Sequence, residues 1–236
     1  MTRRTNARVA GYAFLVYIAA GITSLIVSGK ATAGSGVAAK LASVTQHSAA
    51  VSALVLLALV MTFSAVTLGV TLYALTRDQD RDIAMLGMVC RLLEGIVAGA
   101  PAALGWRWLA GAANNGTLDP QTVQTLGAFI FRSDGEVSAI FFAVGSTLFC
   151  WLFLRGRMIP RALAQLGVAA SLFLVLVLPL QLADVIGGSG SWFGWVTWVQ
   201  WLPMLVFEIW LAILLIVRGV AEPIPAGGGG PIDGRA

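Results

Sequence analysis

Six long apolar runs, separated by short polar stretches, organise the chain. They span Val9–Ser28, Ala49–Leu75, Ile83–Leu109, Val137–Leu154, Leu163–Val185 and Trp195–Val217. A helix of about 20 apolar residues crosses a hydrocarbon core about 30 Å thick. The pattern therefore predicts an all-α fold, a polytopic transmembrane bundle of six helices. One membrane domain is expected over residues 1–220, followed by a disordered glycine- and proline-rich tail over residues 221–236.

Two local patterns add detail to this bundle. Asp119 followed by Pro120 is typical of a helix start, because aspartate caps the first turn and proline suits the first helical position. Residues Gln121–Phe131 are therefore expected to form a short amphipathic helix in the outer loop between the third and fourth spans. In the third span, Gly95 and Gly99 form a small-xxx-small pattern, which lets another helix approach closely.

Composition agrees with a membrane protein and argues against several other classes. Of the 236 residues, 58% are hydrophobic and 11% are charged, whereas soluble domains carry about 25% charged residues. The net charge of +4 does not indicate nucleic-acid binding, because in a membrane protein the position of positive residues matters more than their sum. The sequence has no phosphate-binding glycine loop, nucleophile elbow or Cys-x-x-Cys motif.

Candidate metal and cofactor ligands are few. Cys90 and Cys150 fall in different apolar runs, and His47 is the only histidine in the sequence. A metal site needs several ligands close together, so we expect no metal, and we expect no haem ligation by histidine and no other cofactor. The two cysteines are interpreted as small core residues and His47 as a solvated polar residue.

The basic residues predict the orientation of the bundle. If the N-terminus is inside, ten of them lie on the inner side, namely Arg3, Arg4, Arg8, Arg77, Arg81, Arg155, Arg157, Arg161, Arg218 and Arg235. Four lie outside, namely Lys30, Lys40, Arg107 and Arg132. This positive-inside asymmetry predicts two cytoplasmic termini and a multi-pass protein of the plasma membrane. The first apolar run is too long for a signal peptide and is expected to be retained as a helix.

Three charged residues fall at one depth in the predicted membrane. At 1.5 Å per residue, Arg91 lies roughly 13 Å and Glu94 roughly 18 Å into the third span, and Glu208 lies roughly 15 Å into the sixth. Arg91 and Glu94 also share a helix face. Ionisable groups at such depth are costly, and they mark a functional site or a buried structural pair. We hypothesise that the three side chains meet, so that one carboxyl group holds a proton and can act as a general acid.

Aromatic residues add a second candidate feature. Trp192, Trp195, Trp198 and Trp201 recur at intervals of three before the sixth span. An interfacial belt is the simpler interpretation of the outer three. Alternatively, Trp198, Trp201 and Trp210 form the apolar wall of a ligand-binding pocket beside the charged residues.

Short motifs in a fixed order also resemble a known family. They are Asn6–Gly11, Leu72–Leu75, Arg91–Glu94, Ile159–Arg161, Glu208 with Trp210-Leu211, and Arg218-Gly219. In this order the chain resembles the bacterial membrane-protein family catalogued as domain of unknown function 4386, over nearly all of residues 3–220. The resemblance implies a single membrane domain and supports the same three charged positions.

Three functions fit these features. In the first, which we favour, the bundle binds a lipophilic small molecule and protonates or isomerises it, with Arg91, Glu94 and Glu208 as candidate catalytic residues. In the second, it is a proton-coupled transporter, although the six spans show no clear internal repeat. In the third, it is an accessory or structural membrane subunit. The lipid bilayer is the one partner that all three require, and a homodimer stays open.

Overall fold

The computed structural model describes residues 1–115, 119–132, 136–183, 185–186 and 199–222, and all regular structure in these residues is helical. The helices are α1 (Arg3–Ala31), α2 (Val37–Gln46), α3 (Ser48–Thr76), α4 (Arg81–Asn115), α5 (Pro120–Arg132), α6 (Glu136–Arg155), α7 (Arg161–Leu182) and α9 (Leu202–Val217). The predicted all-α class is confirmed. Most of the predicted tail lies outside the described residues.

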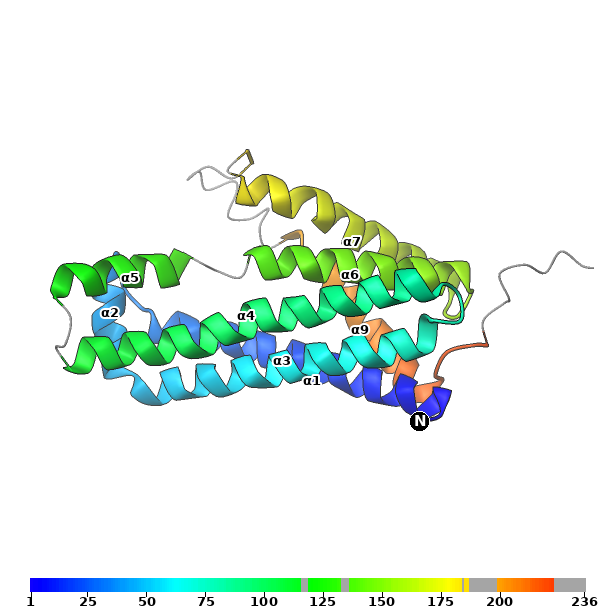
Figure 1. Ribbon diagram of the computed structural model, residues 1–236, viewed down its shortest axis with the longest axis horizontal. Helices are drawn as coiled ribbons and strands as arrows, with labels where there is room; N and C mark the ends of the chain where they lie inside the picture. Colours follow the sequence, from blue (N-terminus) through cyan, green and yellow to red (C-terminus); the bar gives the residue numbers. More distant parts are fainter. Residues whose placement is uncertain (116–118, 133–135, 184, 187–198, 223–236) are drawn as a thin grey trace, which may run out of the picture.

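The six longest apolar helices pack as a closed ring. Along it, α1 packs on α3, α3 on α4, α4 on α6, α6 on α7, α7 on α9, and α9 back on α1. Figure 1 shows α1, α3, α4 and α6 running along the long axis of the molecule, while the shorter α2 and α5 lie together at the end away from the N-terminus. Side chains from all sides of the ring therefore fill one common interior.

Helix length and composition identify a membrane protein. Among the described residues, α1, α3, α6 and α7 are each long and apolar enough to cross a membrane. The predicted third run lies within α4, which extends over 35 residues. Helix α9 is apolar but has 16 residues, and part of the predicted sixth run lies outside the described residues. The membrane class is thus supported, while the number of spans stays a prediction.

Glycines set the closest helix crossings. A Cβ atom at Gly95 would lie 3.2 Å from the Thr62 carbonyl oxygen of α3, and one at Gly99 would overlap the Thr62 hydroxyl. That hydroxyl donates a hydrogen bond to the Gly95 carbonyl oxygen at 3.1 Å. The predicted small-xxx-small pattern therefore lies at the α3–α4 interface. At the α1–α9 crossing, a Cβ at Gly11 would lie 2.7 Å from the Ala212 carbonyl oxygen.

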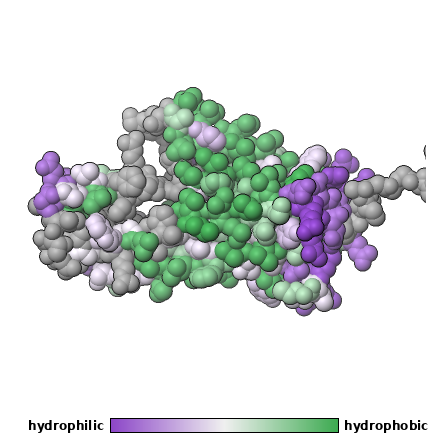
Figure 2. All heavy atoms as spheres, in the orientation of Figure 1, coloured by the Kyte–Doolittle hydropathy of each residue, from purple (hydrophilic) through white to green (hydrophobic). Residues whose placement is uncertain are grey.

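Charge and apolar surface are separated along the molecule. Figure 2 shows an apolar band over the middle and a hydrophilic belt near the end that carries the N-terminus. At this end Arg3 pairs with Asp78 at 3.7 Å, and Arg155 pairs with Asp80 at 3.5 Å. These pairs join the start of α1, the α3–α4 turn and the end of α6, so the arginine-rich ends of the helices meet there.

The segment between α4 and α6 contains the helix predicted from its start motif. The Asp119 carboxylate accepts hydrogen bonds from the backbone N–H groups of Gln121 and Thr122 at 2.9 and 3.0 Å, which caps α5. Gly127 of α5 packs against Leu41 of α2. The position of α5 at the outer surface of a membrane stays a prediction.

Candidate functional site

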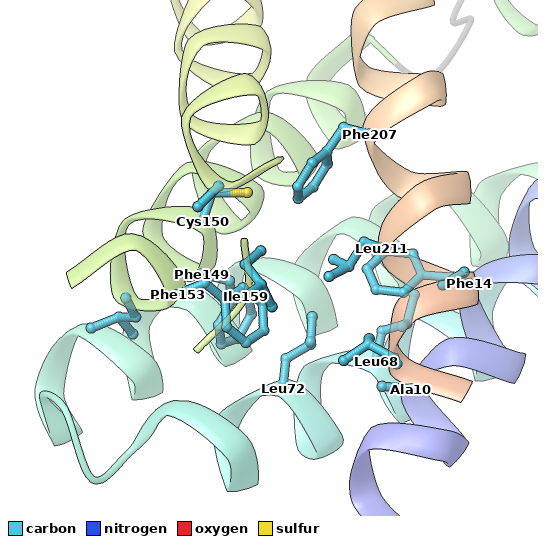
Figure 3. Close-up of a cluster of buried hydrophobic side chains, with 14 of the residues drawn as sticks. Ala10, Phe14, Leu68, Leu72, Phe149, Cys150, Phe153, Ile159, Phe207 and Leu211 are labelled. Atoms are coloured by element: carbon cyan, nitrogen blue, oxygen red, sulfur yellow. The ribbon is translucent and has the colours of Figure 1, made fainter. Parts of the chain in front are cut away.

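Large apolar side chains fill the interior of the ring. Figure 3 shows Phe14 of α1, Leu68 and Leu72 of α3, Phe149 and Phe153 of α6, and Phe207 and Leu211 of α9 converging on one region. All seven side chains are buried. Because this region is buried and largely apolar, any charged group within it depends on its neighbours for compensation.

The three charged residues predicted to meet do so in this interior. The Arg91 guanidinium donates to Glu94 with an N–O distance of 2.7 Å, and its other terminal nitrogen lies 3.5 Å from the Glu208 carboxylate. Their side chains are 1%, 2% and 6% exposed, respectively. The cluster thus joins α4 to α9 through side chains alone, since these two helices do not pack directly on each other.

Glycines on two neighbouring helices make room for the arginine. A Cβ atom at Gly69 of α3 would lie 3.2 Å from the Cβ of Arg91, and one at Gly145 of α6 would lie 3.6 Å from its Cγ. The aliphatic part of Arg91 therefore passes between two side-chain-free positions. Its guanidinium then lies 4.7 Å from the ring centre of Phe142 and 5.8 Å from that of Phe14. Both rings contribute favourable cation–π contacts in this apolar setting.

Tyr17 is a fourth member that the sequence interpretation missed. Its hydroxyl donates to Glu94 at an O–O distance of 2.6 Å. Among the described residues, Glu94 thus accepts two short hydrogen bonds, one from Arg91 and one from Tyr17 of α1, whereas Glu208 has one long contact. The depth of Tyr17 in the membrane is a signal that could have identified it. Tyr17 follows the charged residue Arg8 by nine positions, and Arg91 follows the charged residue Asp82 by the same number.

The cluster has hydrogen-bonding capacity that no described protein group uses. The Arg91 Nε donor and the Ser146 hydroxyl are both buried and have no hydrogen-bond partner among the described residues. Both residues line a void of about 10 Å³, together with Glu208. A void of this size holds about one water molecule. The site is therefore polar on one side, apolar elsewhere, and closed to larger molecules in this conformation.

The predicted tryptophan wall is only partly brought to the cluster. Trp201 packs against Phe142, with ring centres 5.8 Å apart, and Phe142 in turn contacts Arg91. Trp210 is 60% exposed and follows Glu208 by two positions, which places it on the outer side of α9. Trp198 lies outside the described residues.

No metal-binding group is found among the described residues. Three or more His, Cys, Asp or Glu side chains do not converge anywhere in this part of the chain. Cys90 and Cys150 are both buried and free, as expected of core residues. The guanidinium, carboxyl, phenol and hydroxyl groups of the cluster can form ion pairs and hydrogen bonds and can transfer protons.

The fold and the buried cluster define an integral-membrane helical bundle with an ionic centre. The chain belongs to the family described as domain of unknown function (DUF4386), whose sequence profile matches residues 9–219. The family resemblance is thereby confirmed, and the match includes every member of the cluster. No curated protein and no solved structure matches the chain.

Proposed function

We propose that this protein binds a lipophilic small molecule that carries a hydrogen-bond acceptor, with its polar end at the Arg91–Glu94–Glu208 cluster. One observation carries the proposal: the Arg91 Nε donor, in the apolar interior of the ring, has no hydrogen-bond partner among the described residues. A buried donor without a partner costs about 1–3 kcal/mol, which a ligand with a suitable acceptor would recover. The surrounding phenyl rings suit a hydrocarbon body.

Access requires the ring to open. A void of about 10 Å³ admits no carbon chain, so the ligand must displace apolar side chains when it enters. Helix α9 is the element that we expect to move, because among the described helices it packs on α1 and α7 alone and is tied to α4 by the long Arg91–Glu208 contact. A ligand acceptor that engages Arg91 would compete with this contact and favour the open state.

We further propose that the protein lies in the plasma membrane with six spans and with both termini in the cytoplasm. The arginine-rich helix ends meet at one end of the molecule, next to the apolar band, which supports this orientation. In this arrangement α4 crosses with the Arg91 and Glu94 side chains turned into the ring, and α9 forms part of the sixth span. Any chemistry is acid–base: Glu208, the more weakly held carboxyl group, is the candidate proton donor to the ligand.

Native mass spectrometry of the protein in lipid nanodiscs tests the binding. The wild type should retain a lipophilic molecule that is not a bulk lipid. Ser146→Val should lose it, because the added methyl groups occupy the void next to Arg91. Thr147→Val is the matched control, because the Thr147 hydroxyl bonds to its own helix at the Ala143 carbonyl oxygen. It should retain the molecule as the wild type does.

Two outcomes would contradict binding. If the wild type and both variants are empty, the cluster is a structural clamp and the accessory role takes its place. If the protein instead conducts protons across liposomes and Glu208→Gln abolishes the flux, transport takes its place. If a molecule is retained and converted, Glu208→Gln should keep binding and stop conversion, which would establish an enzyme.

A further inference from the structure

A second site lies outside the ring, between α1 and α3. These helices border an open groove of about 730 Å³ with a largely apolar lining that includes Tyr12, Val16, Leu59, Val60 and Phe63. Its volume falls in the range of about 300–1,000 Å³ that is typical of ligand sites. On α3 the lining runs from residue 56 to residue 67, which corresponds to a length of about 16 Å. These dimensions suit an extended hydrocarbon chain.

One end of this groove carries unpaired positive charge. Arg8 precedes Tyr12 by four residues, and Arg4 precedes Arg8 by four, so the three follow one another on one side of α1. Arg4 and Arg8 are exposed, and neither forms an ion pair with an acidic residue in the described part of the chain. Long side chains on a helix point back toward its N-terminus. Both arginines therefore extend from the groove toward the polar belt at that end.

We propose that the groove binds an anionic phospholipid, with an acyl chain along α1 and α3 and the phosphate at Arg8 and Arg4. The apolar lining alone would accept any chain, but the two free arginines at its end select a negative headgroup. A guanidinium matches phosphate oxygens with two parallel N–H donors. The site is distinct from the ring interior, because the groove and the void beside Arg91 share no lining residue.

Lipid retention by mass spectrometry tests this site. The purified protein is equilibrated with equal amounts of phosphatidylglycerol and phosphatidylcholine, and the retained lipids are counted. Each basic residue near a membrane surface contributes roughly fivefold in affinity for anionic lipid. Arg8→Gln should therefore lower the preference for phosphatidylglycerol about fivefold, and Arg8→Lys should largely preserve it. Arg161→Gln is the control, because Arg161 is exposed at the start of α7, which packs on neither α1 nor α3.

A groove-filling variant separates the chain from the headgroup. Val60→Trp should reduce retention of both lipids, because the indole occupies the groove, whereas Leu176→Trp on the exposed face of α7 should not. Equal retention of the two lipids by the wild type, or an equal change in Arg161→Gln, would overturn the proposal. The proposal would also be overturned if the protein were a dimer that retained no lipid in the groove, because a second copy of the chain would then cover this surface.

Discussion

Removing only the positive charge of the cluster should destabilise the folded bundle far more than removing all three charges. In Arg91→Met, two carboxyl groups that are 2% and 6% exposed lose their counter-charge in an apolar interior. Breaking a buried ion pair from one side costs about 3–5 kcal/mol. For a protein of this size each kcal/mol lowers the melting temperature by about 2–4 °C, so we expect a decrease of roughly 10 °C.

The triple variant Arg91→Met, Glu94→Gln, Glu208→Met supplies the comparison. It removes every charge, keeps similar side-chain volumes, and leaves an amide oxygen at position 94 to accept the Tyr17 hydroxyl. Replacing a whole buried ion-pair group by neutral residues is often neutral or stabilising. The triple variant should therefore recover at least about 2 kcal/mol of the loss in the single variant.

Unfolding of the three proteins in mixed detergent micelles, followed by circular dichroism against the mole fraction of dodecyl sulfate, measures these free energies. If the triple variant is as unstable as Arg91→Met, the ion pairs themselves hold the bundle together, and a clamp explains the cluster. If Arg91→Met unfolds like the wild type, the three side chains do not meet in the membrane-embedded protein.

Three further perturbations test other parts of the structure. Tyr17→Phe removes the hydroxyl group that donates a hydrogen bond to Glu94. It should destabilise the bundle by about 1–2 kcal/mol in the same micelle titration. Gly11→Ala should cost about 1–3 kcal/mol, because its Cβ would meet the α9 backbone, whereas Gly29→Ala, with open space around it, should be neutral. Hydrogen bonds from Thr122 hold the pKa of Asp119 below its ordinary value. The ionised Asp119 cap therefore stabilises α5 fully at pH values above the pKa of Asp119 in the unfolded chain. This stabilisation is lost as the pH falls through the pKa of Asp119 in the folded protein. Thr122→Ala should raise the pKa of Asp119, as measured by carboxyl chemical shifts.

The ends of a helix could be predicted well where a uniformly apolar run is bounded by polar or charged residues. The run Ala49–Leu75 differs from α3 by one residue at each end, and Val137–Leu154 differs from α6 equally little. Polar sequence at a helix end was less informative. Helix α1 begins at Arg3, six residues before the apolar run, because the Thr2 hydroxyl caps it by accepting from the Thr5 N–H at 3.2 Å.

The cluster was predictable because depth is a one-dimensional quantity. Counting residues from the charged helix ends placed Arg91, Glu94 and Glu208 at one level, and the structure brings them together. Direction around each helix is harder to infer when the helix is apolar on all sides. For this reason depth alone predicts Trp210 to be part of the pocket wall, whereas it lies on the outer side of α9.

The order of the helices around the ring was beyond sequence reasoning. It depends on which small residues allow close approach, and the sequence does not reveal that Gly69 and Gly145 flank the aliphatic part of Arg91. For the same reason, no pattern could show that the Arg91 Nε donor would have no acceptor among the residues that the structure describes.

If the Arg91 Nε donor anchors a ligand, a high-resolution structure of the wild type in lipid nanodiscs should show it. We expect density for an elongated molecule in the ring interior, with an acceptor atom within about 3.2 Å of Arg91 Nε. A closed interior in which Arg91 Nε is bonded to a single water molecule or to another protein group would contradict it.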